Sequence, residues 1–395
     1  MPKSLRDNFS MQYFVFFLVA FSINAYSYPE FIGMGYTGCM TCHYNGAGNG
    51  GLNDYGRGLF AAEIASKILW NSKYSDEALS ARSGFLGSKT LPFWFRPSLK
   101  YRGLTVEQNP GSKEEHNKTY YQMQQDLNLH LLFNEQQTLL IALNIGSIAN
   151  ESAASPNKPF SGSMLVTREH YLRGQLSEFF WFYLGFMDKV FGIRHPDHTA
   201  VNRSFLGLGQ NSQVHGLVLH YAKDSNEFFF NPFFGNLLLE SKLQMPGFTI
   251  HYEHEPTEML RVGFSFMRDR DVIAIERNTF ALLLKRGIEG GHSILFETGI
   301  KNSLLSSLKT TNNAYVWTQA TMKLLRGLFF QSHMEYFKGD ITKMASENLG
   351  FGVGLLAFPF QRVELRVSGV SSRTINPVTI DKDTWALLSQ VHLSF

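Results

Sequence analysis

From residue 93 to residue 395, apolar and polar side chains alternate with a period of two, which predicts β-strands with two different faces. The segment 121–133 shows this clearly. Its odd positions are mainly apolar, whereas its even positions carry Gln122, Gln124, Asp126, Asn128 and His130. One face of such a strand meets lipid and the other meets polar surroundings, as in transmembrane β-barrels.

Segments of this kind recur about sixteen times, near 93–106, 119–133, 137–149, 164–176, 178–190, 212–224, 226–240, 246–256, 258–270, 273–286, 291–302, 314–325, 327–338, 347–357, 360–371 and 383–395. An even number suits an antiparallel barrel with both ends on one side. The last segment ends on Phe395, which resembles the sorting signal of bacterial outer-membrane barrels. A soluble β-sandwich is the alternative, but aromatic residues that share one face, such as Trp181 and Tyr183, suit the interfacial girdles of a membrane barrel. The predicted fold is therefore all-β, an antiparallel transmembrane barrel of about sixteen strands.

Residues 1–27 are expected to be a cleaved signal peptide. Lys3 and Arg6 give a positive start, 13–23 is almost wholly apolar, and Ala25 and Ser27 are small residues where signal peptidase reads the chain. A membrane anchor is the alternative, but this apolar core falls short of the roughly 20 residues that cross a bilayer. No later run of 18 or more apolar residues occurs, which argues against a helical membrane protein.

Composition agrees with an exported membrane protein. Only 17% of the 395 residues are charged, against roughly 25% in soluble domains, and 14% are aromatic. These values argue against a disordered chain and an ordinary cytosolic enzyme. The formal net charge is +3, so no nucleic-acid partner is expected.

Both cysteines lie in one motif, Cys39-Met40-Thr41-Cys42-His43, which has the C-x-x-C-H spacing that attaches haem c. Two thiols three positions apart reach the two vinyl groups of one haem, and the adjacent imidazole of His43 becomes the proximal iron ligand. Three alternatives remain, namely a Cys39–Cys42 disulfide, a thioredoxin-like redox pair and half of a zinc site. The last two lack a βαβ context and a second pair of metal-binding residues.

The chain therefore divides into a signal peptide (1–27), a monohaem cytochrome c-like cap or plug (28–90) and an outer-membrane barrel (91–395). Within the cap, 44–51 is a loop rich in glycine and asparagine, and 61–70 is predicted to be a short helix. Apolar residues at helical spacing could cover one haem face or pack elsewhere. They are Leu59, Phe60, Ile64, Ile68 and Leu69. With 63 residues, the cap is too small to bury a haem and a core of its own, so it is expected to lean on the barrel.

These features together resemble the fused monohaem cytochrome–porins of the bacterial outer membrane, whose best-studied members oxidise extracellular Fe(II). The matching residues are Pro29, Phe31, Thr37 and Gly38 before the motif, Cys39, Cys42 and His43 within it, and Leu52, Asn53, Gly56, Arg57 and Phe60 after it. The detailed match covers roughly 28–70, and the remainder matches in architecture only. The segment 32–36 replaces the Ala-Arg-Gln run of iron-oxidising members. This difference puts Fe(II) as the electron donor in question, and it affects the expected cap-and-barrel architecture less.

The resemblance implies an electron-transfer protein with one covalent haem c. It would accept electrons from an external donor such as Fe(II), as an Fe(II)-oxidising cytochrome does, and pass them to a periplasmic cytochrome. Outer-membrane lipid would surround the barrel. A diffusive porin whose haem segment gates or senses is the alternative, and a barrel with only a disulfide is a third.

The second axial ligand is not fixed by the sequence. Met34 lies before the motif, and no Met or His occurs between His43 and His116. His130 and His392 face the lumen by strand parity, so they are candidates, although a plain polar lining explains both.

Two further groups are weak metal candidates. In the long connection 191–203, His195 and His198 flank Asp197, although such a segment is more often a polar extracellular or plug loop. A second cluster, explained equally well by a polar strand end, consists of His251, Glu253, His254 and Glu255.

Overall fold

The computed structural model describes residues 31–395 except 49, 69, 89–90, 110–115, 150–162, 198, 242–243, 272–274, 306–308, 345–346 and 377–381. The expected signal peptide, its cleavage site and Pro29 lie outside the described residues, as do Leu69 and His198.

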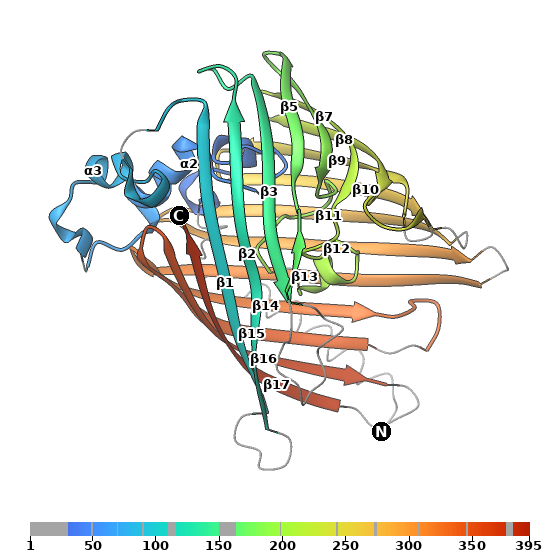
Figure 1. Cartoon of the computed structure of the whole chain (residues 1–395). Coiled ribbons are helices and arrows are strands. Elements are labelled where there is room, and N and C mark those ends of the chain that lie inside the picture. Colours follow the sequence, from blue (N-terminus) through green and yellow to red (C-terminus); the bar gives the residue numbers. More distant parts are fainter. Residues whose placement is uncertain are drawn as a thin grey trace.

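The larger part of the chain is a closed antiparallel β-barrel (Figure 1). Its strands are β1 (Phe95–Gln108), β2 (Asn117–Leu132), β3 (Leu139–Ala149), β4 (Ser163–Val166), β5 (His170–Ser177), β6 (Phe180–Met187), β7 (Val214–Lys223), β8 (Asn226–Gly235), β9 (Gly247–Thr257), β10 (Leu260–Arg270), β11 (Glu276–Ile288), β12 (His292–Leu305), β13 (Lys309–Leu325), β14 (Leu328–Lys338), β15 (Glu347–Phe360), β16 (Val363–Ile375) and β17 (Lys382–Ser394). Strand β1 pairs with both β2 and β17, which closes the wall.

Strands β4 and β5 both pair with β3 and together fill one place in the wall, so the barrel has sixteen strand positions. The predicted sixteen-strand antiparallel barrel is confirmed. The barrel sequence starts and finishes on the same side of the membrane wall, because β1 begins where β17 ends. There the Leu99 amide donates to the Phe395 carbonyl at 2.8 Å.

Strand parity separates the two faces as expected. On β2, Asp126, Asn128 and His130 are buried inside the barrel, whereas Leu127 on the other face is 51% exposed. On β17, Trp385 and Val391 also point outward. Apolar side chains left exposed around a closed wall fit a lipid environment, in which a barrel satisfies every strand hydrogen bond internally. The architecture is therefore that of a bacterial outer-membrane protein.

The two ends of the barrel differ. Tight turns such as 224–225, 258–259, 326–327 and 361–362 join strands at one end, and longer connections join them at the other. In outer-membrane barrels the short turns face the periplasm.

The cap, 31–88, lies at the short-turn end (Figure 1). It contains short 3-10 turns η1 (Ile32–Met34), η2 (Cys39–Thr41), η4 (Trp70–Lys73) and η5 (Phe85–Gly87), and helix α3 (Asp76–Ala81). Its main helix runs through α2 (Asp54–Leu59) into a π-helical turn, η3 (Phe60–Ile64). The helix predicted at 61–70 thus begins seven residues earlier and ends at Ile64, because Asn53 caps its start by accepting from the Gly56 amide at 2.8 Å.

No helix among the described residues is long and apolar enough to cross a membrane.

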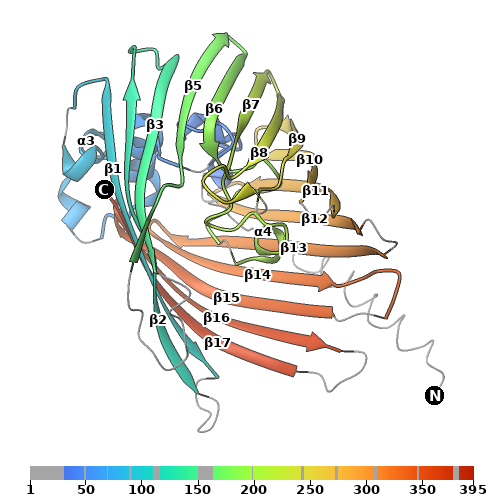
Figure 2. The ribbon, with the colours of Figure 1, turned by 45° about the vertical axis from the view of Figure 1, so that its right-hand side comes forward.

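The connection between β6 and β7 folds into the lumen, as Figure 2 shows for its helix α4 (Val201–Ser204). We call residues 188–213 the inward loop. On one side, the Ile193 amide donates to Glu297 Oε2 of β12 at 2.6 Å. On another side, the Gln210 side chain donates to the Met123 carbonyl of β2 at 3.1 Å. The inward loop thus spans the interior, in agreement with the expectation of a plug loop.

Candidate cofactor site between the cap and the inward loop

A cavity of about 310 Å³ lies where the cap, the inward loop and the barrel wall meet. The cap contributes Cys39, Cys42 and His43, the inward loop contributes His195 and Arg203, and the wall contributes Lys100, Arg102, Glu364 and His392. The fold therefore brings the whole C-x-x-C-H motif to one interior cavity. Its size falls within the range of pockets that bind cofactors.

Residues that follow the motif hold it in place. His43 forms an antiparallel bridge with Leu52, and the Asn53 amide donates to the Cys42 carbonyl at 2.9 Å. The Asn53 side chain also donates to the Thr41 carbonyl at 3.0 Å. A Cβ at Gly56 would lie 2.4 Å from the Cys42 carbonyl oxygen, so only glycine lets helix α2 approach the motif this closely. These contacts give a structural role to the Leu-Asn-x-Tyr-Gly-Arg segment.

The glycine-rich loop that follows the motif, 44–51, is bound to the inner wall of the barrel. Arg173 donates to the Tyr44 carbonyl at 2.8 Å, and the Gly46 amide donates to the Tyr183 hydroxyl at 3.0 Å. Lys100 donates to the Gly50 carbonyl at 2.8 Å. The motif is thus fixed inside the barrel, as expected for a cap that leans on it.

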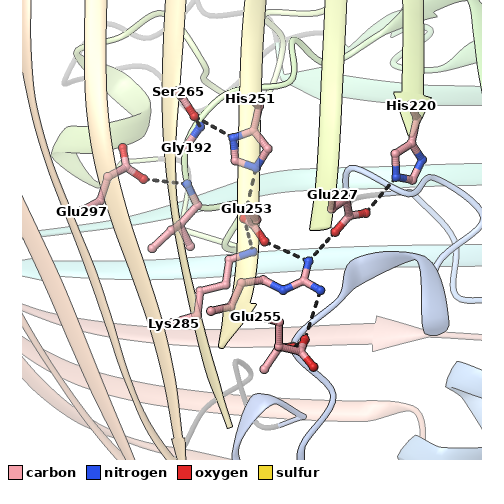
Figure 3. A network of polar contacts seen from close by, with 12 residues as sticks. Gly192, His220, Glu227, His251, Glu253, Glu255, Ser265, Lys285 and Glu297 are labelled. Carbon is pink, nitrogen blue, oxygen red and sulfur yellow. Dashed lines mark hydrogen bonds and ion pairs between the residues drawn. The ribbon is translucent and has the colours of Figure 1, made fainter. Parts of the chain in front are cut away.

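An ion-pair cluster on the wall supports the other side of the motif (Figure 3). Arg261 pairs with Glu227, with Glu253 at 3.1 Å and with Glu255 at 3.1 Å. Lys285 pairs with Glu253 at 2.5 Å. Thr37, two positions before Cys39, hydrogen-bonds to Glu255. The cluster therefore anchors the chain where it enters the motif.

The weak metal cluster expected at 251–255 is part of this ion-pair network. His251 contacts Ser265 Oγ at 2.6 Å through Nδ1 and Glu253 at 3.0 Å through Nε2. His254 contacts the Asn226 side chain at 3.1 Å instead. Among the described residues, no group of three or more His, Cys, Asp or Glu side chains could hold a metal ion. The contacts of His251 and Glu253 are therefore those of a hydrogen-bond and ion-pair network.

The charges around the cavity are strongly unbalanced. One carboxylate, Glu364, faces seven cationic side chains: Arg57, Lys100, Arg102, Arg194, Arg203, Lys285 and Arg362. Three of these are neutralised by partners, since Arg57 pairs with Asp54, Arg194 pairs with Asp188 at 2.5 Å and Lys285 pairs with Glu253. The Nε of Arg203 has no hydrogen-bond partner among the described residues. The cavity therefore favours an anionic ligand.

The two thiols are free in this structure. Burial raises the pKa of the Cys42 thiol to about 11, with a further contribution from Cys39, and burial likewise raises the pKa of Cys39. Both thiols are protonated at neutral pH as a result.

The structure separates the candidates for a second axial ligand. His392 lines the cavity, whereas His130 and Met34 are not among its lining residues. His130 stacks on Tyr44 with 4.4 Å between ring centroids, and Met34 packs against the buried cluster that contains Phe358. Parity correctly placed His130 and His392 inside the barrel, but it could not tell which one lines the cavity.

His195 also lines the cavity, although the sequence indicated it only as a member of a weak metal cluster. Its Nε2 contacts Asn202 Oδ1 at 3.0 Å and its ring stacks on Trp317. Burial lowers the pKa of His195 to about 4, so its imidazole is neutral. Asp197 is hydrogen-bonded to Thr199.

Of the apolar cap residues proposed to cover a haem face, Phe60 lines the cavity. Ile64 instead packs in the buried cluster with Phe329 and Phe358, and Ile68 is 69% exposed. Other apolar side chains complete the lining, including Ile193, Leu295, Phe358 and Phe395.

The lining fits the chemistry of haem c. Two thiols and an adjacent imidazole supply the attachment and one iron ligand, apolar side chains suit the macrocycle, and cationic side chains suit its two propionates. The buried Nε2 of His392 has no hydrogen-bond partner among the described residues, so it is available as a further ligand.

Comparisons with known proteins bear on the fold. No protein-family model matches the sequence, and the search of curated proteins found no match. Solved structures match the barrel. OmpT of Vibrio cholerae has 11% identity and a TM-score of 0.58, covering 76% of this chain and 99% of that chain. OprB of Pseudomonas putida has 9% identity and a TM-score of 0.59, covering 77% and 94%. An anion-selective porin from Comamonas acidovorans has 8% identity and a TM-score of 0.57, covering 76% and 99%.

At these identities the likeness concerns the fold. It defines the class as a porin-like outer-membrane β-barrel. Within that class, this chain has a lumen that contains its own N-terminal cap with a C-x-x-C-H motif, opposite an inward loop.

Proposed function

We propose that the protein is an outer-membrane electron-transfer protein that binds one haem c through Cys39, Cys42 and His43. It would take electrons from an extracellular donor such as Fe(II) and pass them to a periplasmic cytochrome. When bound, the haem supplies a one-electron iron couple. The observation that carries the proposal is the position of both thiols and the His43 imidazole at one largely cationic interior cavity.

The chain's own residues would bind and orient the group. Cys39 and Cys42 form the thioether bonds, and His43 ligates the iron. Arg203 and Lys100 neutralise propionates, and Phe60 and Phe358 exclude water from the ring. Burial of this kind tunes the potential of the iron.

The placement also suits electron exit toward the periplasm. The cavity is lined by Phe395, Arg362 and Ser83, which belong to the short-turn end of the barrel or to the cap beside it. A periplasmic carrier would dock at this end. On the opposite side the inward loop contributes Arg194 and His195, so an external donor would approach through the lumen beyond that loop.

A second function is a diffusive porin whose haem-bearing segment gates or senses. It is favoured by the likeness of the barrel to porins, among them one described as anion-selective. The cationic lining of the lumen also suits an anionic solute. The two functions make different demands on the cap. A diffusive porin needs the cap to leave the lumen, whereas an electron-transfer protein needs it to stay there.

The first experiment is the visible spectrum of the oxidised protein, extracted in detergent, before and after anaerobic addition of Fe(II). A reduced c-type α band upon mixing is expected. A haem that dithionite reduces but Fe(II) does not would remove iron as the donor, and a chain without haem would overturn the electron-transfer function.

Planar-bilayer conductance distinguishes the diffusive porin from the electron-transfer protein. The intact chain should conduct poorly, whereas a large stable conductance would favour the porin. A Cys42→Ala variant is the matched control, since it should lose normal haem attachment while its barrel still inserts.

A further inference from the structure

We propose that His392 is the second axial ligand of the haem iron and that Glu364 is the residue that positions it. This inference rests on the proposed function, because it needs a haem held by His43. It adds a ligand from the barrel wall, more than three hundred residues away in sequence, to a motif in the cap.

The geometry of His392 is that of an imidazole prepared for a metal. It lies on β17 directly opposite Glu364 on β16, and its Nδ1 is 3.1 Å from Glu364 Oε2. A carboxylate accepts from Nδ1–H, which leaves the lone pair on Nε2. Histidines that bind metals usually donate their other ring N–H to a carboxylate or carbonyl in this way.

The second ring nitrogen of His392, Nε2, is buried and has no hydrogen-bond partner among the described residues. The same holds for Nε2 of His130 and Nδ1 of His195, so what distinguishes His392 is the carboxylate on its other ring nitrogen. His392 lines the same cavity as Cys42 and His43. An iron held in this cavity would offer this nitrogen a partner.

Glu364 is itself held in place. Its side chain is 6% exposed, and its Oε1 accepts from Arg366 and from Gln390, each at 3.4 Å. The other oxygen, Oε2, is the one that contacts His392. The carboxylate therefore has a fixed orientation that it imposes on the imidazole.

His195 is the main competitor, and its surroundings suit it less. Its ring lies flat on Trp317, with centroids 4.2 Å apart and an interplanar angle of 10°. The partner of its Nε2 is the neutral side-chain amide of Asn202, which raises the basicity of the ring less than a carboxylate does. Ligation through Nδ1 would also have to preserve this stacking.

The test compares three histidine variants of the holoprotein, purified from outer membranes. In His392→Ala, the ferric spectrum and electron paramagnetic resonance should change from low-spin to high-spin iron, with haem content unchanged because the thioether bonds remain. Added imidazole should restore the low-spin state. The matched controls, His130→Ala and His195→Ala, should remain low-spin.

Glu364→Gln tests the positioning role. It should keep the low-spin spectrum and raise the midpoint potential, because a neutral partner withdraws less of the Nδ1 proton and lowers imidazole basicity. An unchanged potential would refute the role of Glu364. If Glu364 served only to stabilise the barrel, Glu364→Gln would change barrel folding instead of the potential. Heat-dependent gel mobility measures barrel folding.

Other results separate the inference from the proposed function. Low-spin iron retained in His392→Ala would overturn the inference while leaving the electron-transfer function in place. A wild-type chain without haem would overturn the proposed function itself. If the barrel of His392→Ala fails to insert, His392→Met is measured instead. A methionine-ligated spectrum is expected, and an unaltered one would refute the ligand.

Discussion

The close approach of helix α2 to the C-x-x-C-H motif predicts opposite effects for two glycine-to-alanine changes. At Gly56, an added Cβ would lie 2.4 Å from the carbonyl oxygen of Cys42. At Gly58, two positions along the same helix, it would lie 2.5 Å from the Ser80 hydroxyl oxygen. Alanine is favoured over glycine in a helix by about 1 kcal/mol at either position. The difference therefore depends on what each new methyl meets.

At Gly56 the neighbour is backbone that also supports the motif, and it cannot rotate away. Overpacking of this kind costs about 1–3 kcal/mol, and contact with fixed backbone places it near the upper end. After the gain in helix propensity, a net loss of about 2 kcal/mol remains. At Gly58 a hydroxyl can turn aside, so most of the gain of about 1 kcal/mol should be retained.

Hydrogen exchange of the peptide 51–60 measures the difference. Its amides include that of Asn53, which donates to the Cys42 carbonyl at 2.9 Å. A loss of about 2 kcal/mol should accelerate exchange roughly 30-fold in Gly56→Ala, and Gly58→Ala should exchange up to about 5-fold more slowly than wild type. If Gly56→Ala exchanges no faster than wild type, the packing of this helix against the motif is wrong.

Three other predictions concern how the cap and the inward loop are held. Asn53→Ala removes the cap of helix α2 and the hydrogen bond to the Thr41 carbonyl, and it should cost at least about 1 kcal/mol in the same exchange measurement. Exchange at the wild-type rate would contradict the capping role. Arg326 donates to the carbonyl of Ala65 at 2.8 Å, so Arg326→Met should loosen the cap and speed tryptic cleavage within 67–82. An unaltered cleavage rate would mean that this contact does not hold the cap. The buried carboxylate of Glu297 accepts from the Ile193 amide at 2.6 Å. Glu297→Ala should therefore detach the inward loop from the wall and raise bilayer conductance. Conductance at the wild-type level would show that other contacts hold the loop.

The barrel was predictable because a strand in a membrane wall has a strict period of two. The alternation at 121–133 placed Asp126 and His130 inside correctly. The assignment of Trp181 and Tyr183 to an outer aromatic girdle was wrong, because both are buried inside the barrel and pack with Tyr44 of the cap. Strand β4 was predicted to be continuous with β5, and the break at 167–169 had no periodic signal.

The helix of the cap was predicted too late in the chain. Gly56 and Gly58 lower helix propensity at 54–59, and the apolar spacing at 59–69 therefore dominated the pattern. Asn53 followed by Asp54 is a capping signal that indicates the correct start.

The composition of the site was harder to predict than the motif at its centre. The spacing of Cys39, Cys42 and His43 is local, so the sequence alone indicated the chemistry. The pairing of His392 with Glu364 depends on the register between β16 and β17, and the approach of His195 depends on the path of the inward loop. Both are long-range properties that no short pattern encodes.

The way in which the lumen is filled distinguishes the two proposed functions. The cap is held at the short-turn rim by Arg326, and the inward loop is held across the interior by Glu297. A second polar cavity of about 130 Å³ adjoins the first and shares Lys100, His195 and His392 with it. A porin function requires a solute to pass these anchored segments. An electron needs neither of them to move, and the contacts that anchor them would keep a single haem fixed between its two partners.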